Sequence, residues 1–341
     1  MHRVKSCFWI IAIAATAILA GCRDTESPEG KKLVYGFLTP GPDTYYKKNV
    51  EGFQYAAGLG GTEVIVLNSN YDVEKEIANI ESLILQGVDG MCVFTFNESG
   101  ANIAAKKCAR AKIPLVVIDN FGEVLKQNDD VVACIDFDWE AMGSDWADYI
   151  AKTFPGENIA MVTGLFESVP VQKYRSTFEP RVKELGKNKI VAIRDGKYDP
   201  SIAANQAQDL IESGEKFSVL LVGNEDMAAA IVRMLSARQL LNNPIKIITV
   251  NGSPVGIPLV SDGSINYTVS SSPGWEGMIS FLALHAHLKG KIDKINQRII
   301  LPMTAVTQET VNDKTKIVPW DVDPVWLELT AKLYPEYNGL Y

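Results

Sequence analysis

Short runs of β-branched and aromatic residues alternate with longer amphipathic segments along most of the chain. Such short runs are typical of buried strands, and the longer segments between them carry helical spacing. In residues 72–87, for example, four apolar residues share one helical face: Ile77, Ile80, Leu83 and Ile84. Strands that alternate with helices predict βα units and parallel sheets.

The alternation yields ten strand candidates. They are residues 33–38, 62–69, 90–96, 114–120, 131–137, 158–164, 190–196, 217–223, 245–251 and 265–271. Ten strands exceed the usual size of one open sheet. Because the two halves of the chain look alike, with five candidates each, two similar lobes are favoured over a single barrel of eight regular repeats. The predicted fold class is therefore α/β, with two doubly wound parallel-sheet lobes.

Polar residues follow most of the predicted strands. In open parallel sheets, ligands bind beyond the carboxyl ends of the strands. The residues at these positions include Thr39, Asn68, Asn70, Asn97, Asp119, Asn120, Asp195, Asn224, Asn251 and Ser271. Two lobes that face each other would direct these groups into a shared cleft.

The N-terminal residues predict secretion. A basic stretch is followed by an apolar run, residues 8–18, that is too short to span a membrane. The next four residues, L-A-G-C, resemble a bacterial lipobox, in which the cysteine is lipidated and becomes the mature N-terminus. We expect a signal peptide at 1–21, lipidation of Cys22 and a polar tether at 22–31. A plain signal peptide with an incidental cysteine is the alternative.

Three cysteines remain in the mature chain beyond Cys22. Cys92, Cys108 and Cys134 lack metal-ligand spacing, so we expect them to be small buried hydrophobic residues, with one disulfide as the alternative. The formal net charge of -8 is spread along the chain, which argues against a nucleic-acid partner.

Six segments, in this order, resemble the periplasmic sugar-binding proteins of the ribose-binding type, the type I substrate-binding fold of ABC importers. They are YGFLTPGPDTYYKKNVEGF, ANIESLILQGVDGMCV, AKIPLVVIDN, VLLVGNEDMAAAIVRML, IITVNGSPVG and SDGSINYTVSSSPGWEG. The resemblance implies that the two lobes close around a small polyol by a three-segment hinge. The hinge segments would lie near Phe137 and Asp138, near Ser271 and Ser272, and near Arg298.

The resemblance also implies domain boundaries. The N-terminal lobe would comprise residues 32–136 and 272–297, and the C-terminal lobe residues 137–271 and 298–312. Residues 313–341 lie beyond the resemblance as a C-terminal extension, and we expect its tryptophans to pack across a lobe near the hinge.

The family's ligand contacts fall on particular positions of this chain. The resemblance implies Asp43, Tyr45 and Tyr46 after the first strand, Asp119 after the fourth, and then Tyr198, Asn224 and Ser271. Carboxylates and amides would pair with sugar hydroxyls, and aromatic rings would contact apolar sugar faces. For Tyr45 and Tyr46, core packing beside Val50 and Phe53 is the alternative.

The chain also departs from the family pattern. Asn120 and Gln172 stand where ribose and galactose binders carry arginines, and Asn251 stands where they carry an aspartate. Arg175, one turn after Gln172, is a candidate substitute; without it, the aspartates would leave the cleft acidic. A pentose or hexose is the first hypothesis, and a cyclitol or an amine-bearing sugar stays open.

The leading functional prediction is an extracytoplasmic lipoprotein, in the periplasm or on the cell surface, that delivers a small polyol to an ABC permease. It implies no enzymatic activity, cofactor or metal. His285 and His287 are two residues apart on a helix, which does not suit a metal pair. The alternatives are a binding protein that feeds a chemoreceptor or sensor kinase, and an extracytoplasmic enzyme on a similar scaffold.

Overall fold

The computed structural model describes residues 32–95, 97–119, 131–238, 245–292 and 297–340, which belong to one compact unit, Lys32–Tyr341. Four predictions lie outside the described residues: the signal peptide, the lipidation of Cys22, the polar tether at 22–31 and a ligand contact by Asn120. In the described part of the chain, no helix combines the length and the apolar character that crossing a membrane requires.

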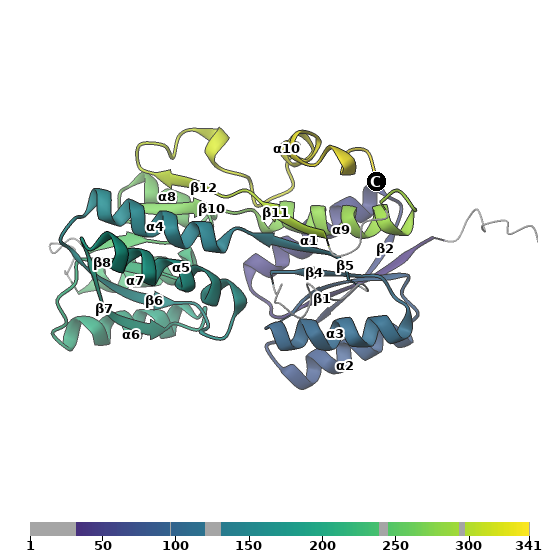
Figure 1. Ribbon diagram of the computed structural model, residues 1–341, viewed down its shortest axis with the longest axis horizontal. Helices are drawn as coiled ribbons and strands as arrows, with labels where there is room; N and C mark the ends of the chain where they lie inside the picture. Colours follow the sequence, from purple (N-terminus) through teal and green to yellow (C-terminus); the bar gives the residue numbers. More distant parts are fainter. Residues whose placement is uncertain (1–31, 96, 120–130, 239–244, 293–296, 341) are drawn as a thin grey trace, which may run out of the picture. The chain divides into compact units, whose positions relative to one another are not determined.

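The first lobe is built on a six-stranded parallel sheet with the order β11-β5-β4-β3-β1-β2. Its strands are β1 (Val34–Thr39), β2 (Glu63–Asn68), β3 (Gly90–Phe94), β4 (Leu115–Ile118), β5 (Val131–Phe137) and β11 (Gln297–Leu301). Its helices are α1 (Thr44–Leu59), α2 (Val73–Leu85), α3 (Glu98–Ala111) and α9 (Pro273–Leu288). Phe53 of α1 and Phe281 of α9 pack into one core cluster, and Leu83 of α2 into another, so helices cover both faces (Figure 1).

The second lobe is built on a second six-stranded sheet with the order β12-β10-β9-β8-β6-β7. Its strands are β6 (Asn158–Thr163), β7 (Lys189–Asp195), β8 (Val219–Val222), β9 (Lys246–Ile248), β10 (Tyr267–Ser270) and β12 (Thr304–Thr307). All pairs are parallel except β10 with β12. Its helices are α4 (Trp139–Thr153), α5 (Val169–Leu185), α6 (Pro200–Glu212), α7 (Glu225–Ala237) and α8 (Gly256–Ser261).

The predicted fold class is confirmed, with two more strands than the sequence indicated. The ten predicted segments correspond to β1 to β10, and each sheet gains one further strand from the region after α9. β11 pairs with β5 and β12 with β10, so both additions complete a sheet edge.

The chain crosses between the lobes three times before its C-terminal segment. The crossings after β5, at Phe137 and Asp138, and after β10, at Ser271 and Ser272, are where we expected them. The third differs, because Arg298 pairs with Cys134 inside the first sheet. The chain therefore crosses after β11, at residues 302–303, a few residues beyond the position expected near Arg298.

Cys92, Cys108 and Cys134 are buried free thiols, as the sequence predicted. His285 accepts or donates a hydrogen bond at Nδ1 to the hydroxyl of Tyr35, 2.8 Å away, and stacks on Phe281. This histidine therefore belongs to the core of the first lobe.

After β12, residues 313–340 form a short 3-10 turn η3 (Lys314–Lys316), helix α10 (Val325–Leu333) and a second turn η4 (Pro335–Tyr337). Trp320, Trp326 and Tyr337 of this segment are buried. Trp275 of α9 is fully buried as well, and its indole N–H donates to Thr330 Oγ1 at 3.0 Å. Trp275 therefore packs against the C-terminal segment.

Candidate ligand-binding cavity

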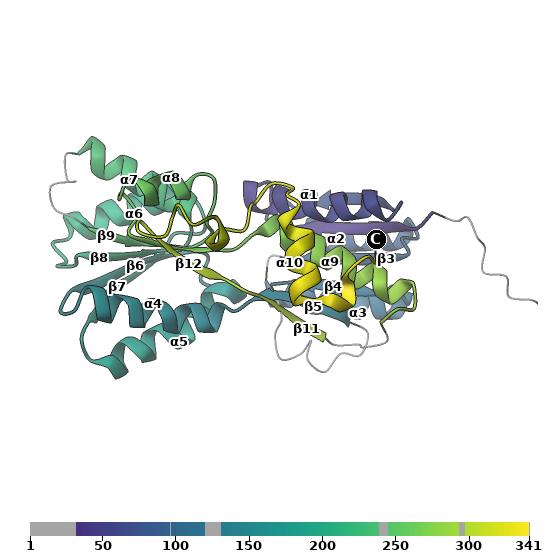
Figure 2. The same cartoon turned by 90° about the horizontal axis from the view of Figure 1, so that it is seen from above.

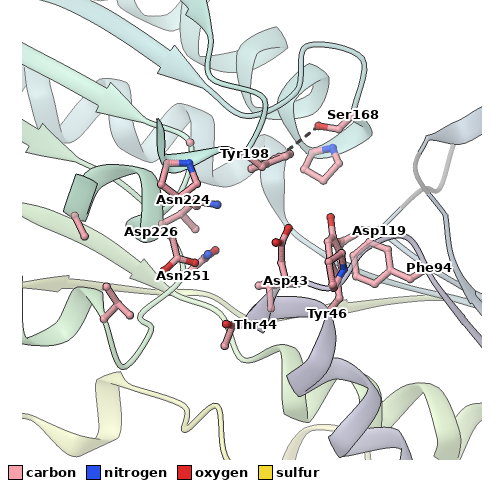
Figure 3. A pocket seen from close by; sticks show the side chains of 18 of the residues that line it. Asp43, Thr44, Tyr46, Phe94, Asp119, Ser168, Tyr198, Asn224, Asp226 and Asn251 are labelled. Carbon is pink, nitrogen blue, oxygen red and sulfur yellow. Dashed lines mark hydrogen bonds between the residues drawn. The ribbon is translucent and has the colours of Figure 1, made fainter. Parts of the chain in front are cut away.

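A cavity of about 460 Å³ lies between the two lobes at the carboxyl ends of the strands (Figure 3). Both lobes contribute to its lining, which is a mixture of aromatic rings and hydrogen-bonding groups. The lining includes Asp43, Thr44, Tyr45, Tyr46, Phe94, Thr95 and Asp119 from the first lobe, with Trp139, Ser168, Tyr174, Tyr198, Asn224, Asp226, Arg233 and Asn251 from the second.

Tyr45 and Tyr46 both line the cavity, although they are adjacent on α1. Their rings meet edge to face, with centroids 5.8 Å apart, and both also pack edge to face against Phe94. Both are at the same time packed against the core cluster that contains Phe53 and Phe281. Core packing and cavity lining are therefore combined in each ring, rather than divided between them.

The Tyr45 hydroxyl is directed toward a buried carboxylate. It lies 3.4 Å from Glu276 Oε2 on α9, which also accepts a 2.7 Å hydrogen bond from Asn49 Nδ2. Burial raises the pKa of Glu276 well above its usual range, and the negative charge of Asp119 raises it further. Tyr45 is thus held in place by α9 as well as by its own helix.

Asp43 immediately precedes α1 and does not cap it with its side chain. Its carboxylate instead accepts a hydrogen bond from the hydroxyl of Tyr71, a residue with a left-handed backbone (φ 58°) in the loop after β2. The ring of Tyr71 packs in turn on Tyr46. The loops after β1 and β2 therefore fix one rim of the cavity together.

Asp119 follows β4 with a left-handed backbone (φ 57°), a conformation that aspartate tolerates better than most residues. Its side chain is 3% exposed, and Oδ1 accepts a hydrogen bond from Trp139 Nε1 at 3.2 Å. Burial raises the pKa of Asp119 well above its usual range, and the Asp136 carboxylate raises it further. A ligand hydroxyl or ammonium group that donated a hydrogen bond to Asp119 would offset the free-energy cost of burying its charged carboxylate.

On the opposite side, Tyr198 lies close over Gly164, where an added Cβ would come within 2.1 Å of the ring. Its hydroxyl lies 3.3 Å from Ser168 Oγ (Figure 3). Burial raises the pKa of Tyr198 to about 12. Glycine after β6 is therefore required for this aromatic wall of the cavity.

Two asparagines present amide groups to the cavity. Asn224 caps α7, its Oδ1 accepting from Met227 N at 2.9 Å, which leaves its amide NH₂ free to donate. The Asn251 side chain is 8% exposed and has no hydrogen-bond partner among the residues that the structure describes. Its backbone has φ 133°, a region that favours glycine.

Three predicted ligand contacts do not line the cavity. Gln172 donates to the Glu167 carbonyl at 3.4 Å and is directed elsewhere. Arg175 is engaged by Glu179, with Nε 2.6 Å from Oε1, and lies over the ring of Phe166. Ser271 is 1% exposed, and its Oγ is buried without a hydrogen-bond partner among the described residues. The α5 face and the hinge backbone turn these side chains away from the cavity.

Several cavity residues were missed by the sequence analysis, above all Trp139, Asp226 and Arg233. Arg233 is the only cationic side chain of the described cavity lining, against the carboxylates of Asp43, Asp119 and Asp226. Trp139 directly follows the first crossing, so the strand-end rule could have found it. Asp226 and Arg233 lie on α7, and no strand-end signal marks them.

The cavity suits binding of a small polyhydroxylated molecule. It offers hydrogen-bond donors and acceptors from both lobes together with flat aromatic faces. No cluster of three or more metal-binding side chains occurs in the described residues.

Residues 35–292 match the model of a family described as a periplasmic binding protein domain. The chain belongs to this family. It is a family of substrate-binding transport proteins rather than of enzymes, and it implies a location outside the cytoplasm.

Curated relatives of this periplasmic binding protein are named as sugar import proteins. It is 22% identical to the ribose import binding protein of Haemophilus influenzae over 295 residues, 86% of this chain and 97% of the relative. It is 24% identical to the fructose import binding protein of Bifidobacterium longum, covering 85% of this chain and 91% of the relative.

Solved structures share the two-lobed type I fold. An ABC transporter solute-binding protein of Bacillus halodurans with bound myo-inositol superposes with a TM-score of 0.76 at 19% identity, over 83% of this chain and 96% of that one. The binding protein of the arabinose transporter from a Shewanella species, bound to L-arabinofuranose, gives a TM-score of 0.75 at 24% identity, over 82% and 93%.

Proposed function

We propose that this periplasmic binding protein captures a monosaccharide or a similar small polyol in the cavity between its lobes and delivers it to an ABC permease. The observation that carries the proposal is the composition of the lining, in which aromatic rings and hydrogen-bonding side chains from both lobes surround one cavity. The names of the relatives, which concern ribose, fructose, arabinose and myo-inositol, support the same ligand class.

The lining selects for hydroxyl groups. A buried polar group whose hydrogen-bonding capacity is not met costs about 1 to 3 kcal/mol. The Asn251 amide, and the Asp119 carboxylate beyond its one hydrogen bond from Trp139, therefore favour a ligand that pairs with both. Tyr46 and Tyr198 offer aromatic walls for the apolar C–H faces of a sugar ring.

The charge of the cavity lining further narrows the class of ligand that we propose. Among the described residues, three carboxylates and one guanidinium line the cavity, so an anionic ligand such as a sugar phosphate would meet net repulsion. We therefore propose a neutral polyol, or one that carries an amine, and not an anionic sugar.

Ligand contacts from both lobes would favour the closed arrangement. Asp43 and Asp119 belong to the first lobe, whereas Asn224 and Asn251 belong to the second. A ligand that bridges them binds the closed form more tightly than the open one and shifts the population toward it. The closed form is the state that we propose the permease recognises.

Thermal unfolding against a panel of neutral sugars, cyclitols, amino sugars and sugar phosphates tests the proposal. A ligand present at 100 times its dissociation constant adds about 2.7 kcal/mol of stability and raises the unfolding midpoint. We expect at least one neutral or amine-bearing polyol to raise the midpoint, and the sugar phosphates to leave it unchanged. A panel in which no polyol raises the midpoint would contradict the proposal.

We also propose that Cys22 carries the lipid that anchors the protein to a membrane. The support is the L-A-G-C sequence behind a basic and apolar leader. Mass spectrometry of the mature N-terminus should find a diacylated cysteine at this position. Release of the Cys22→Ser protein from the membrane fraction would agree with the proposal, and an unmodified mature N-terminus elsewhere would overturn it.

A further inference from the structure

The C-terminal segment, residues 313–340, passes from the second lobe to the first, as the yellow ribbon in Figures 1 and 2 shows. On the second lobe, the amide of Val318 donates to Ser270 Oγ at 3.1 Å. On the first lobe, the hydroxyl of Tyr334 donates to the carbonyl of Ile300 at 2.6 Å. The segment lies outside residues 35–292, the part that the family model matches.

Trp320 occupies the point where this segment passes the hinge. Its indole N–H donates to two backbone carbonyls, those of Asn251 at 3.1 Å and Ser271 at 2.9 Å. Its side chain is buried. One donor therefore joins a residue of the cavity to the second crossing between the lobes.

The same indole also contacts the first lobe. Its ring meets Tyr45 edge to face, with centroids 5.6 Å apart. The next residue, Asp321, forms an ion pair with Lys48 of α1 at 2.6 Å. Trp320 is thus in contact with cavity-lining residues of both lobes, Tyr45 of the first and Asn251 of the second.

Residues at the second crossing and at the start of α9 leave room for the C-terminal segment and bind it. A Cβ at Gly274, in the first turn of α9, would lie 2.5 Å from the Trp320 carbonyl and 2.4 Å from the ring of Trp326. Ser272 Oγ donates to the carbonyl of Pro319 at 2.6 Å, directly before the tryptophan. The segment is therefore seated closely against the second crossing.

The unusual backbone conformation of Asn251 depends on contacts such as the hydrogen bond from Trp320. Its backbone lies at φ 133°, and such a conformation persists only where the surroundings hold it. The carbonyl that Trp320 binds also accepts from Ser271 N at 3.0 Å. The Asn251 side chain, which faces the cavity without a partner in the described residues, is oriented by this backbone.

From these contacts we infer that the C-terminal segment is a fourth link between the lobes, and that Trp320 is a positioning residue for the cavity. It holds Asn251 in its unusual conformation and ties it to Tyr45, so that the segment limits how far the lobes separate. The inference rests on the proposed function only in treating Asn251 and Tyr45 as ligand contacts. Its test therefore needs no ligand.

The test compares three variants with the wild type. Trp320→Phe keeps a ring against Tyr45 but removes the donor to both carbonyls, and Trp320→Ala removes ring and donor. Trp326→Phe is the matched control, because its indole N–H donates to the carbonyl of Pro319 within the same segment, at 2.9 Å. Unfolding midpoints establish that each variant is folded and how far each is destabilised.

Amide hydrogen exchange of residues 249–253 and 267–273 is the first measurement. Losing the two hydrogen bonds should speed exchange there roughly fivefold or more in Trp320→Phe. Trp326→Phe, at a similar loss of thermal stability, should leave these amides unchanged. Equal acceleration in both variants would reduce Trp320 to a merely structural residue and overturn the inference.

The separation of the lobes is the second measurement. Spin labels at Lys106→Cys and Asn205→Cys, both exposed and on different lobes, report the distance in the ligand-free protein with Cys7 and Cys22 replaced by serine. We expect a longer and broader distance distribution in Trp320→Ala, a smaller change in Trp320→Phe and none in Trp326→Phe. An unchanged distribution in Trp320→Ala would exclude a limit on opening.

Discussion

Lys173, on helix α5 of the second lobe, forms an ion pair with Asp136, near the end of strand β5 in the first lobe. The Asp136 carboxylate is fully buried and also accepts a hydrogen bond from Arg298 of β11 at 3.0 Å. Two cations from different lobes therefore share one buried anion beside the hinge. Removing one partner of a buried pair leaves charge without compensation.

We expect Lys173→Met to lower the free energy of unfolding by about 2 kcal/mol or more, with Arg298 retaining part of the interaction. Adding Asp136→Asn should recover a large part of this loss, because the buried carboxylate that Lys173 compensated is then removed. Urea unfolding measures both. Lys107→Met, which breaks the more exposed pair with Glu81, is the control and should cost less than about 1 kcal/mol. Similar losses in Lys173→Met and Lys107→Met would contradict the expectation.

Asp119→Asn should weaken binding of the best polyol from the panel by about 1 to 3 kcal/mol, because it replaces one acceptor oxygen of a buried group that lines the cavity with a donor NH₂. Asparagine suits the left-handed backbone and relieves the repulsion from Asp136, so thermal stability should hold or rise without ligand. Calorimetric titration and ligand-free unfolding separate the two effects. Unchanged affinity in a stable variant would place Asp119 outside the ligand contacts.

Arg233 and Arg175 offer a matched pair of arginine variants. Arg233 lines the cavity, whereas Arg175 is held by Glu179 and Phe166 outside it. We expect Arg233→Gln to raise the dissociation constant roughly fivefold, the equivalent of about 1 kcal/mol, and Arg175→Gln to change it less than twofold. The reverse result would restore Arg175 as the substitute donor that its helix position suggested.

Glu225, at the start of α7, should make stability depend on pH. Its carboxylate accepts hydrogen bonds from Gly252 N, Ser253 N and Thr268 Oγ1, but burial dominates and raises its pKa to about 7. The folded protein binds the Glu225 proton more tightly than the unfolded chain does. The stabilisation that comes from this proton is therefore complete below about pH 4.5. It is lost as pH rises through about 7, a change of about 3 kcal/mol.

Urea unfolding between pH 5 and 8 measures this dependence. Glu225→Gln cannot titrate, so its stability should vary less with pH over this interval than that of the wild type. Glu215→Gln, at an exposed position, should retain the wild-type slope. A Glu225→Gln slope equal to the wild-type slope would assign the titration to another group.

The sequence predicted most of the fold because the strands of doubly wound sheets are nearly continuous apolar runs, such as LVVI in β4. β11 and β12 escaped this signal. β11 (QRIIL) has an apolar run of only three residues, and β12 (TAVT) has only two apolar residues, both small. They are strands because β5 and β10 offer edges to pair with. Pairing of residues so distant in sequence is not visible in local periodicity.

The candidate site was also predicted only in part from the sequence. The strand-end rule located Asp119, Asn224 and Asn251, because parallel strands bring their carboxyl ends to one edge. The strand-end rule could not locate cavity residues that lie on helices. Arg233 faces the cavity and Arg175 does not, and this depends on how α7 and α5 are rotated against their sheet. Ser271 follows a strand, yet the hinge backbone buries its hydroxyl away from the cavity.

The three buried thiols have a practical consequence. Cys92, Cys108 and Cys134 all lie in the first lobe, on β3, α3 and β5, and burial raises the pKa of Cys108 to about 12. Since the thiolate is the reactive form, alkylating reagents reach them only when this lobe opens. With Cys7 and Cys22 replaced, the rate of alkylation therefore measures how fast the first lobe unfolds. The second lobe has no cysteine in the residues described and does not contribute to this rate.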